Sequence, residues 1–159
     1  MAYIRTKKIS DNLYCYLVEN KQTKNGPRQK VKKYLGKAIT LEAKKELDPE
    51  FNLKLEKKEL LLDLIRYELL NHSFKKKDDL LINQKVVFNL NELKATKGKK
   101  EVVLKLNEGF LCNFTLKRIL AFKKTNDINE DALKLARYFV EAGINIPKDV
   151  FVEFYQKKR

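Results

Sequence analysis

The sequence has little of the residue types that build most metal and catalytic sites. Its 159 residues include one histidine and two cysteines. Cys15 and Cys112 each lie in an apolar-looking run rather than in a cluster of metal ligands, which predicts buried thiols in a reducing cytoplasm. His72 comes near the end of a predicted helix, where a capping or surface role is favoured over general-base catalysis.

The short motifs that mark several enzyme classes are also missing. The chain has no HExxH or CxxC pair, no phosphate-binding GxxxxGK(S/T) and no GxSxG turn around a nucleophile. Glu59 and Asp63 lie a turn apart on one predicted helix, a spacing more typical of a solvated face than of a metal site. We therefore expect no catalysis, no cofactor and no metal, although a nuclease built from scattered carboxylates would escape these patterns.

Long hydrophobic runs are absent as well. No apolar stretch approaches the length that a bilayer-spanning helix needs, and no basic-then-apolar leader opens the chain. We expect a cytoplasmic protein that does not enter a membrane. The hydrophobic content of 43% is sufficient for a packed core in one domain or in two small ones.

Acidic residues are scarce where basic residues are plentiful. Residues 1–37 contain ten lysines and arginines but only two acids, so over half of the formal net charge of +14 lies in the first quarter of the chain. A lysine-rich solubility coat would spread its charge evenly. The asymmetry favours a surface for a polyanion, above all nucleic acid, over plain solvation or a protein partner.

The same basic segment predicts three β-strands, at residues 2–9, 13–20 and 28–35, because it is rich in aromatic and β-branched residues between turn-forming pairs. Strict alternation in the third strand would gather most of its cations on one face. That predicted face comprises Arg28, Lys30, Lys32 and Tyr34. A basic ribbon of this kind is narrow enough to enter a major groove, while lysines on a solvent-facing sheet also protect an edge from aggregation.

The two strand sequences YxYLVEN and RQKVKKYLG, with a short loop between them, resemble the N-terminal segment of transposases of the IS4/IS1634 type, where a comparable hairpin precedes the catalytic region. The order of three strands and a helix is similar to the arm-type DNA-binding modules of tyrosine recombinases. The resemblance covers about residues 3–37, and the catalytic domain has no counterpart here. It implies a DNA-binding surface that comprises Tyr16, Arg28, Lys30, Lys32, Lys33, Tyr34 and Lys37.

The middle of the chain is predicted to be structural. Thr40 would cap a helix over residues 41–47, and a longer helix would begin at Leu55 and end at Asn71. Its broad leucine stripe is typical of a helix face that packs into a core. The alternative is that the stripe contacts a second copy of the chain, as a homodimer, or another protein partner. The charge run at residues 75–79 would end this helix and link two lobes.

The last part of the chain predicts a hairpin and a helical cluster. Residues 85–90 and 101–106 would be strands around a basic turn at residues 97–100, where lysines are also common without any ligand. Three helices would follow, the first capped by Thr115, the second between Asp127 and Gly143 and the third from Pro147. A secondary basic patch on the first, where cations also match the helix dipole, comprises Lys117, Arg118, Lys123 and Lys124.

The sequence therefore predicts an α+β fold with a three-stranded antiparallel sheet and following helix, a long central helix, a second hairpin and a C-terminal helical cluster. The expected parts are a basic sheet module at 1–47, a helix and linker at 48–78, and a hairpin with helical lobe at 79–159, which can also pack as one domain. The predicted function is non-catalytic nucleic-acid binding, with DNA favoured over RNA. Lysines and arginines would release phosphate counterions while Tyr14, Tyr16 or Tyr34 stacks or packs at the groove.

Two other functions remain open at this point. The chain can be a protein-interaction or assembly subunit that uses the leucine-rich helix, with its lysines serving solubility. It can also be a domesticated fragment of a mobile element that regulates its relatives.

Overall fold

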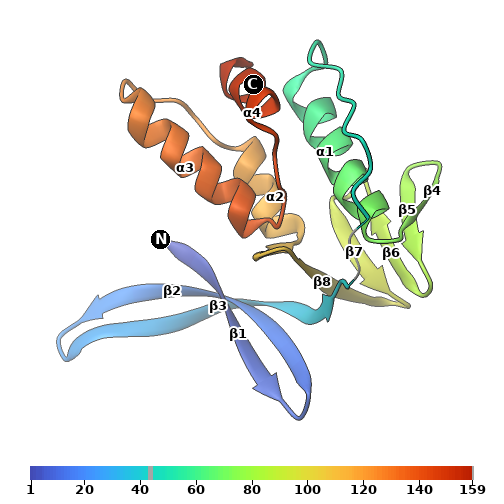
Figure 1. Cartoon of the computed structure of the whole chain (residues 1–159). Helices are drawn as coiled ribbons and strands as arrows, with labels where there is room; N and C mark the ends of the chain where they lie inside the picture. The colour runs from blue at the N-terminus through green and yellow to red at the C-terminus, as the bar shows by residue number, and fades with distance from the viewer. Residues whose placement is uncertain (43–44, 159) are drawn as a thin grey trace.

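The computed structural model describes residues 1–42 and 45–158, and within them the chain has an α+β fold (Figure 1). The strands are β1 (Ala2–Ile9), β2 (Asn12–Thr23), β3 (Gly26–Thr40), β4 (Lys75–Lys77), β5 (Leu80–Asn83), β6 (Val86–Asn89), β7 (Lys94–Lys97), β8 (Lys100–Leu106) and β9 (Gly109–Leu111). The helices are α1 (Lys57–Asn71), α2 (Asn113–Leu120), α3 (Ile128–Glu141) and α4 (Lys148–Gln156). In Figure 1 the helices lie together in the upper part of the view, with β1, β2 and β3 below them.

One parallel strand pair joins the N-terminal part of the sheet to the rest. The strand order is β1-β2-β3-β8-β7-β6-β5-β4, and β9 also pairs with β8. β3 and β8 are parallel, with Lys37 opposite Val102 and Thr40 opposite Lys105. The other strand pairs of the described chain are antiparallel. β8 is therefore the strand on which the two parts of the molecule meet.

The three N-terminal strands predicted from the sequence are confirmed. Gly26 turns the chain from β2 into β3 with a φ of 100°, a conformation that glycine adopts without strain. The expected end of the third strand near Gly36 is wrong, because β3 continues to Thr40. Residues beyond Gly36 extend because they pair with β8, a long-range contact that local sequence does not show.

β2 is shared by two hairpins that extend in opposite directions. β1 pairs with β2 from Asn12 to Glu19, and β3 pairs with it from Tyr14 to Thr23. Beyond Glu19, β2 and β3 therefore form a two-stranded ribbon, which projects from the body at the left of Figure 1. Every residue from 20 to 34 except Gly26 is exposed, so both faces of the ribbon, in which residues 20–23 pair with residues 26–29, are in solvent.

Buried side chains lie on both sides of β8. Val102 and Leu104 belong to the main core, together with leucines of α1 and aromatic residues of α3 and α4. Val103 belongs to a smaller cluster with Cys15 and Cys112. The main core contains residues from α1, from β5 to β8 and from α2 to α4, and it therefore extends across both sides of residues 75–79.

The long central helix is confirmed and begins two residues later than predicted, at Lys57. Its leucine stripe is fully buried in the core of this chain. The buried stripe comprises Leu60, Leu61, Leu64, Ile65 and Leu69. These side chains stabilise the fold and offer no free apolar face to a second protein.

The helix predicted over residues 41–47 is absent from the described residues of that segment. The Leu41 N–H donates to the Lys105 carbonyl at 2.8 Å and so extends the hydrogen bonding between β3 and β8. The Lys45 N–H donates to the Asn71 carbonyl at 2.7 Å, at the end of α1. The remaining two residues of the predicted helix, at 43–44, lie outside the described residues. Long-range hydrogen bonds thus override local helix propensity here.

The prediction of a second hairpin is right about its turn and about the presence of both strands, and wrong about their pairing. The turn around Gly98 connects β7 to β8, with Lys97 opposite Lys100. Residues 85–90 contain β6, which pairs with β7 rather than with β8. No pattern in the sequence indicates β4, β5, β7 or β9, because alternation is hard to detect in strands of three or four residues. The charge run expected as a linker contains the edge strand β4.

Two of the three C-terminal helices begin where the sequence predicts. The Asp127 side chain accepts a hydrogen bond from the Glu130 N–H at 3.0 Å, and Pro147 directly precedes α4. The predicted Thr115 cap is wrong, because α2 already begins at Asn113 and Cys112 is its N-cap. Thr115 instead lies one turn into α2, where its hydroxyl accepts from the Cys112 N–H at 3.2 Å.

Candidate nucleic-acid interface

Two β-bulges in β3 decide which of its side chains share a face. The register between β2 and β3 shifts twice, so Tyr34 lies opposite Tyr16 while Lys30 lies opposite Glu19. Tyr16 and Glu19 are three residues apart on one strand and therefore point to opposite faces. The sequence pattern contains no mark of either bulge. The prediction of one common face is therefore wrong for Arg28, Lys30, Lys32 and Tyr34.

The inner face of the N-terminal sheet carries a row of cations. This face packs toward α2 and β9, because its Cys15 lies in the small buried cluster with Cys112 and Phe110. The register places Lys21 opposite Arg28 on this same face, followed by two further lysines toward the body. We define the cationic row by four exposed inner-face residues, the first two in the ribbon and the last two where β1 also pairs with β2: Lys21, Arg28, Lys30 and Lys33.

Lys32 has a different role from the one predicted for it. Its Nζ lies 2.9 Å from Oε2 of Glu19, the only acidic residue in β1, β2 and β3, all of whose residues the structure describes. The hydrogen bond and the charge of Lys32 hold the pKa of Glu19 below its ordinary value. Lys32 thus pairs with the one acid of these three strands, and no residue of the cationic row forms an ion pair within the described chain.

The outer face of the same sheet carries the tyrosines. The Tyr14 and Tyr16 rings each contact Tyr34, with centroid distances of 6.5 and 5.2 Å. Burial, followed by the neighbouring Tyr16 and Tyr14, raises the pKa of Tyr34, so its phenol stays neutral. The Tyr34 side chain is 51% exposed, which leaves ring surface for contact with a ligand. Lys37 lies opposite Tyr14 on this face and is half-buried.

β1 adds two cations to the outer face that sequence reasoning missed. Arg5 lies opposite Tyr16 and Lys7 opposite Tyr14, and both cations are exposed. The Arg5 guanidinium donates to the Gln29 side chain of β3, which holds it across the sheet. Applying the same alternation to residues 2–9 as to the later strands would have found both cations.

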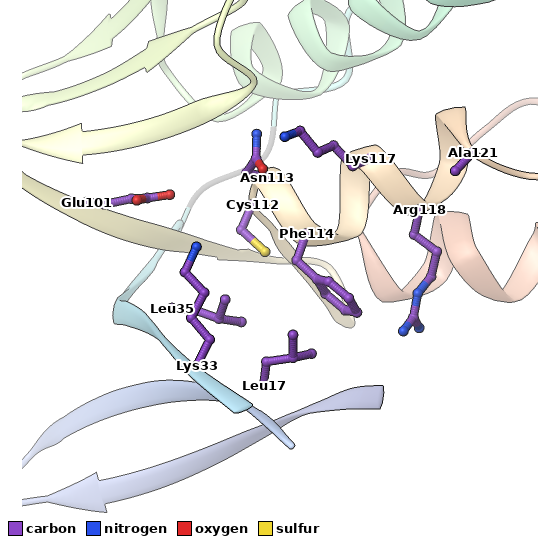
Figure 2. A pocket seen from close by; sticks show the side chains of 10 residues that line it. All are labelled: Leu17, Lys33, Leu35, Glu101, Cys112, Asn113, Phe114, Lys117, Arg118 and Ala121. Atoms are coloured by element: carbon purple, nitrogen blue, oxygen red, sulfur yellow. The ribbon is translucent and has the colours of Figure 1, made fainter. Parts of the chain in front are cut away.

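A pocket of about 430 Å³ lies between the inner face of the sheet and α2 (Figure 2). Leu17 and Leu35 line it from the sheet and Phe114 lines it from α2. Lys33 rises from the sheet toward Glu101 and Cys112, and Lys117 extends from α2 toward Asn113 (Figure 2). The pocket thus joins the end of the cationic row to one member of the predicted secondary patch.

Arg118, a second member of that patch, is a structural residue. Its guanidinium donates to the Glu141 carboxylate at 3.0 Å and to the Ala2 carbonyl at 2.5 Å. It also stacks over the Phe114 ring at 4.3 Å and the Tyr138 ring at 5.3 Å. With its side chain only 13% exposed, Arg118 fastens β1 to α2 and α3 rather than offering its charge to a ligand.

Lys123 and Lys124 lie apart from the groove between sheet and α2. They line a different hollow with Lys57, at the end of α4. The Lys124 Nζ donates to the Gln156 carbonyl at 3.3 Å and lies 4.9 Å from the centre of the Tyr155 ring. The structure therefore divides the predicted secondary patch, and of its members only Lys117 and Arg118 line the groove beside the sheet.

The two cysteines are buried, as predicted, and belong to the same small cluster. Burial, with the neighbouring Cys112 as the next cause, raises the pKa of the Cys15 thiol to about 11. Burial also raises the pKa of Cys112, against hydrogen bonds from Thr115 that lower it. Both thiols are therefore protonated near neutral pH, and neither is a ready nucleophile.

His72 is the C-cap residue of α1 and is buried rather than on the surface. Neither of its ring nitrogens has a hydrogen-bond partner in the described chain. Across residues 1–42 and 45–158, no three His, Cys, Asp or Glu side chains are placed to hold a metal ion together. Within the same residues, no helix has both the length and the apolar character needed to cross a bilayer.

Comparison of the chain with family models, with curated proteins and with solved structures finds no match. The interpretation of the site therefore depends on the residues and the geometry described above.

Proposed function

We propose that this protein binds nucleic acid, with duplex DNA as the preferred form, through the ribbon and its cationic row. The observation that carries the proposal is the ribbon, a projecting pair of strands with both faces in solvent, together with the row of four cations that begins on its inner face and continues toward the body. An exposed cation without an acidic partner adds little to stability, whereas a row of them suits a chain of phosphates.

The shape of the ribbon favours DNA over RNA. The major groove of B-form DNA is about 12 Å wide and admits a two-stranded ribbon, whereas the major groove of A-form RNA is too deep and narrow for side chains to read. Residues 20–25 and 27–29 of the ribbon are exposed, and the ribbon projects from the body in Figure 1, so its end is open to a groove.

The tyrosine cluster supports the same proposal from the other side of the sheet. Tyr34 exposes half of its surface beside Tyr16, and Arg5 and Lys7 lie along the same face. Aromatic side chains stack on bases, and neighbouring cations hold the backbone that carries those bases. Phosphate contacts from the row would position the ligand, and the outer face would contact a distorted or unpaired part of it.

The proposal is tested by removing charge from the row while keeping polar side chains at the same positions. The variant Lys21→Gln, Arg28→Gln, Lys30→Gln keeps the first two methylenes of each side chain and removes three cations. We expect its affinity for a mixed-sequence duplex at physiological salt to fall at least about tenfold, because three phosphate contacts are lost.

The matched control is Lys75→Gln, Lys76→Gln, Lys77→Gln, which removes the same charge from the exposed edge strand β4. Affinities of both variants would be measured by fluorescence anisotropy with duplex DNA, single-stranded DNA and duplex RNA. Equal weakening by the two variants would show that only net charge matters and would contradict a specific ribbon site. A preference for duplex RNA would contradict the groove argument.

A further inference from the structure

The groove between the N-terminal sheet and α2 has the features of a small-ligand site. Its volume of about 430 Å³ lies within the range of about 300 to 1,000 Å³ that such sites occupy in proteins. Its floor is apolar and partly aromatic, from Leu17, Leu35 and Phe114, and the other lining residues include Lys33, Glu101, Asn113, Lys117 and Arg118. A pocket of this kind takes a ligand with a flat or apolar body and charged or polar groups at its edge.

The charges of the groove specify the polar end of that ligand. Arg118 is already satisfied by Glu141 and by the Ala2 carbonyl. Lys33 and Lys117 form no ion pair within the described chain, and they line the groove from its two walls. Glu101, on β8, lies on the side of the groove toward which Lys33 rises, whereas the groove residues contributed by α2 include no acid.

The Phe114 ring lines the groove and also packs against the small cluster around Cys15 and Cys112. The Arg118 guanidinium lies 4.3 Å from the ring centre, and the same ring lines the pocket. A ring held by a stacked guanidinium is a rigid platform, and a planar group in the groove would extend the stack.

We propose that this groove binds one unpaired nucleotide, with its base against Phe114 and its phosphate between Lys33 and Lys117. The inference rests on the proposed function and makes it more specific. Lys33 is both the last residue of the cationic row and a wall of the groove, so a strand that follows the row toward the body reaches the groove directly. The favoured ligand is therefore DNA in which a duplex meets an unpaired stretch.

The test uses adenosine 5′-monophosphate as the probe and the full chain labelled with ¹⁵N. We expect the nucleotide to shift the amide NMR signals of Asn113 and Phe114. Inorganic phosphate should bind more weakly than the nucleotide, because it has no ring to contact the apolar floor. The variant Lys117→Gln should weaken the nucleotide about tenfold, since it removes one charge-assisted hydrogen bond. Lys134→Gln, on the exposed side of α3, is the matched control and should change nothing.

A second variant, Leu17→Trp, fills the groove with an indole and should abolish the shifts. Thermal unfolding of each variant shows whether it is folded, and Lys117→Gln, at a charged and solvated position, keeps the test valid if Leu17→Trp fails to fold. Nucleotide binding no tighter than phosphate binding, or shifts spread over the whole surface, would overturn the inference.

The outcomes separate this inference from the function on which it rests. If duplex DNA binds the ribbon but the nucleotide does not shift the amide signals of the groove, the groove site is overturned and the proposed function stands. Nucleotide binding in the groove without any binding of DNA would keep the groove site and overturn the proposed function.

Discussion

Arg118 shows how one side chain can hold together segments that are distant in the sequence. It connects α2 to the backbone of β1 through the Ala2 carbonyl and to α3 through Glu141. The same guanidinium stacks between the rings of Phe114 and Tyr138. The sequence shows only a basic residue in a basic stretch, so its structural role could not be separated from a ligand-binding role before the fold was known.

Replacing this side chain tests its structural role. Arg118→Met keeps much of the volume but leaves the Glu141 carboxylate and the Ala2 carbonyl without their donor. We expect the free energy of unfolding to fall by about 2 kcal/mol, the usual loss when a partly buried charged hydrogen-bonding group is removed. Urea denaturation followed by circular dichroism measures this.

The control for that measurement is Arg137→Met on α3, where the arginine is exposed and forms no ion pair within the described chain. Its free energy of unfolding should stay within about 0.5 kcal/mol of the native value. Equal effects from the two variants would contradict the structural role of Arg118.

At the level of elements, the sequence predicted the longer ones and missed the shorter ones. β1, β2 and β3, the long α1, and the α3 start at Asp127 follow from composition, apolar spacing and capping. The helix over 41–47 fails because Leu41 and Lys45 bond to distant carbonyls. The two bulges in β3 depend on how β2, β3 and β8 fit together, and no local pattern reports them.

The bulges also explain how much of the site the sequence could predict. Lys30 and Lys33 were correctly placed in the basic sheet, but their assignment to faces relied on unbroken alternation. A single extra residue moves every later side chain to the other face. The groove could not be predicted at all, because Lys33 and Lys117 are far apart in the chain and meet only in the folded molecule.

The junction between β3 and β8 depends on Gly36. It has a φ of 131°, and an added Cβ would lie 2.6 Å from the Glu101 carbonyl oxygen of β8. Gly36→Ala therefore combines backbone strain with a backbone clash, and we expect it to lower the free energy of unfolding by about 2 kcal/mol or more.

Gly98→Ala provides the comparison for this glycine, because Gly98 also has a positive φ, of 64°, but an added Cβ meets no atom within 4 Å. We expect it to cost about 1 kcal/mol, from conformation alone. Thermal unfolding of both variants measures the difference. A Gly98→Ala loss as large as that of Gly36→Ala would contradict the close approach of β3 to β8.

On the scale of the whole molecule, the fold consists of a packed body and a ribbon that projects from it. The main core accounts for the helices and the strands from β5 to β8, whereas the ribbon is exposed throughout. The parallel pairing of β3 with β8, the small cluster around Cys15 and the Arg118 contacts join the two parts. The groove lies where the two parts meet, so a ligand there would contact both the N-terminal sheet and the body.

The most direct test of the central claim is the salt dependence of binding to a mixed-sequence DNA duplex. Each phosphate neutralised contributes about 0.9 to the slope of log affinity against log salt concentration. We expect a slope of about −4 or steeper, reduced by about three when Lys21, Arg28 and Lys30 are replaced by glutamine and unchanged when the β4 lysines are replaced. A shallow slope near zero, or one that the two variants reduce equally, would contradict the claim that the ribbon is the surface that binds nucleic acid.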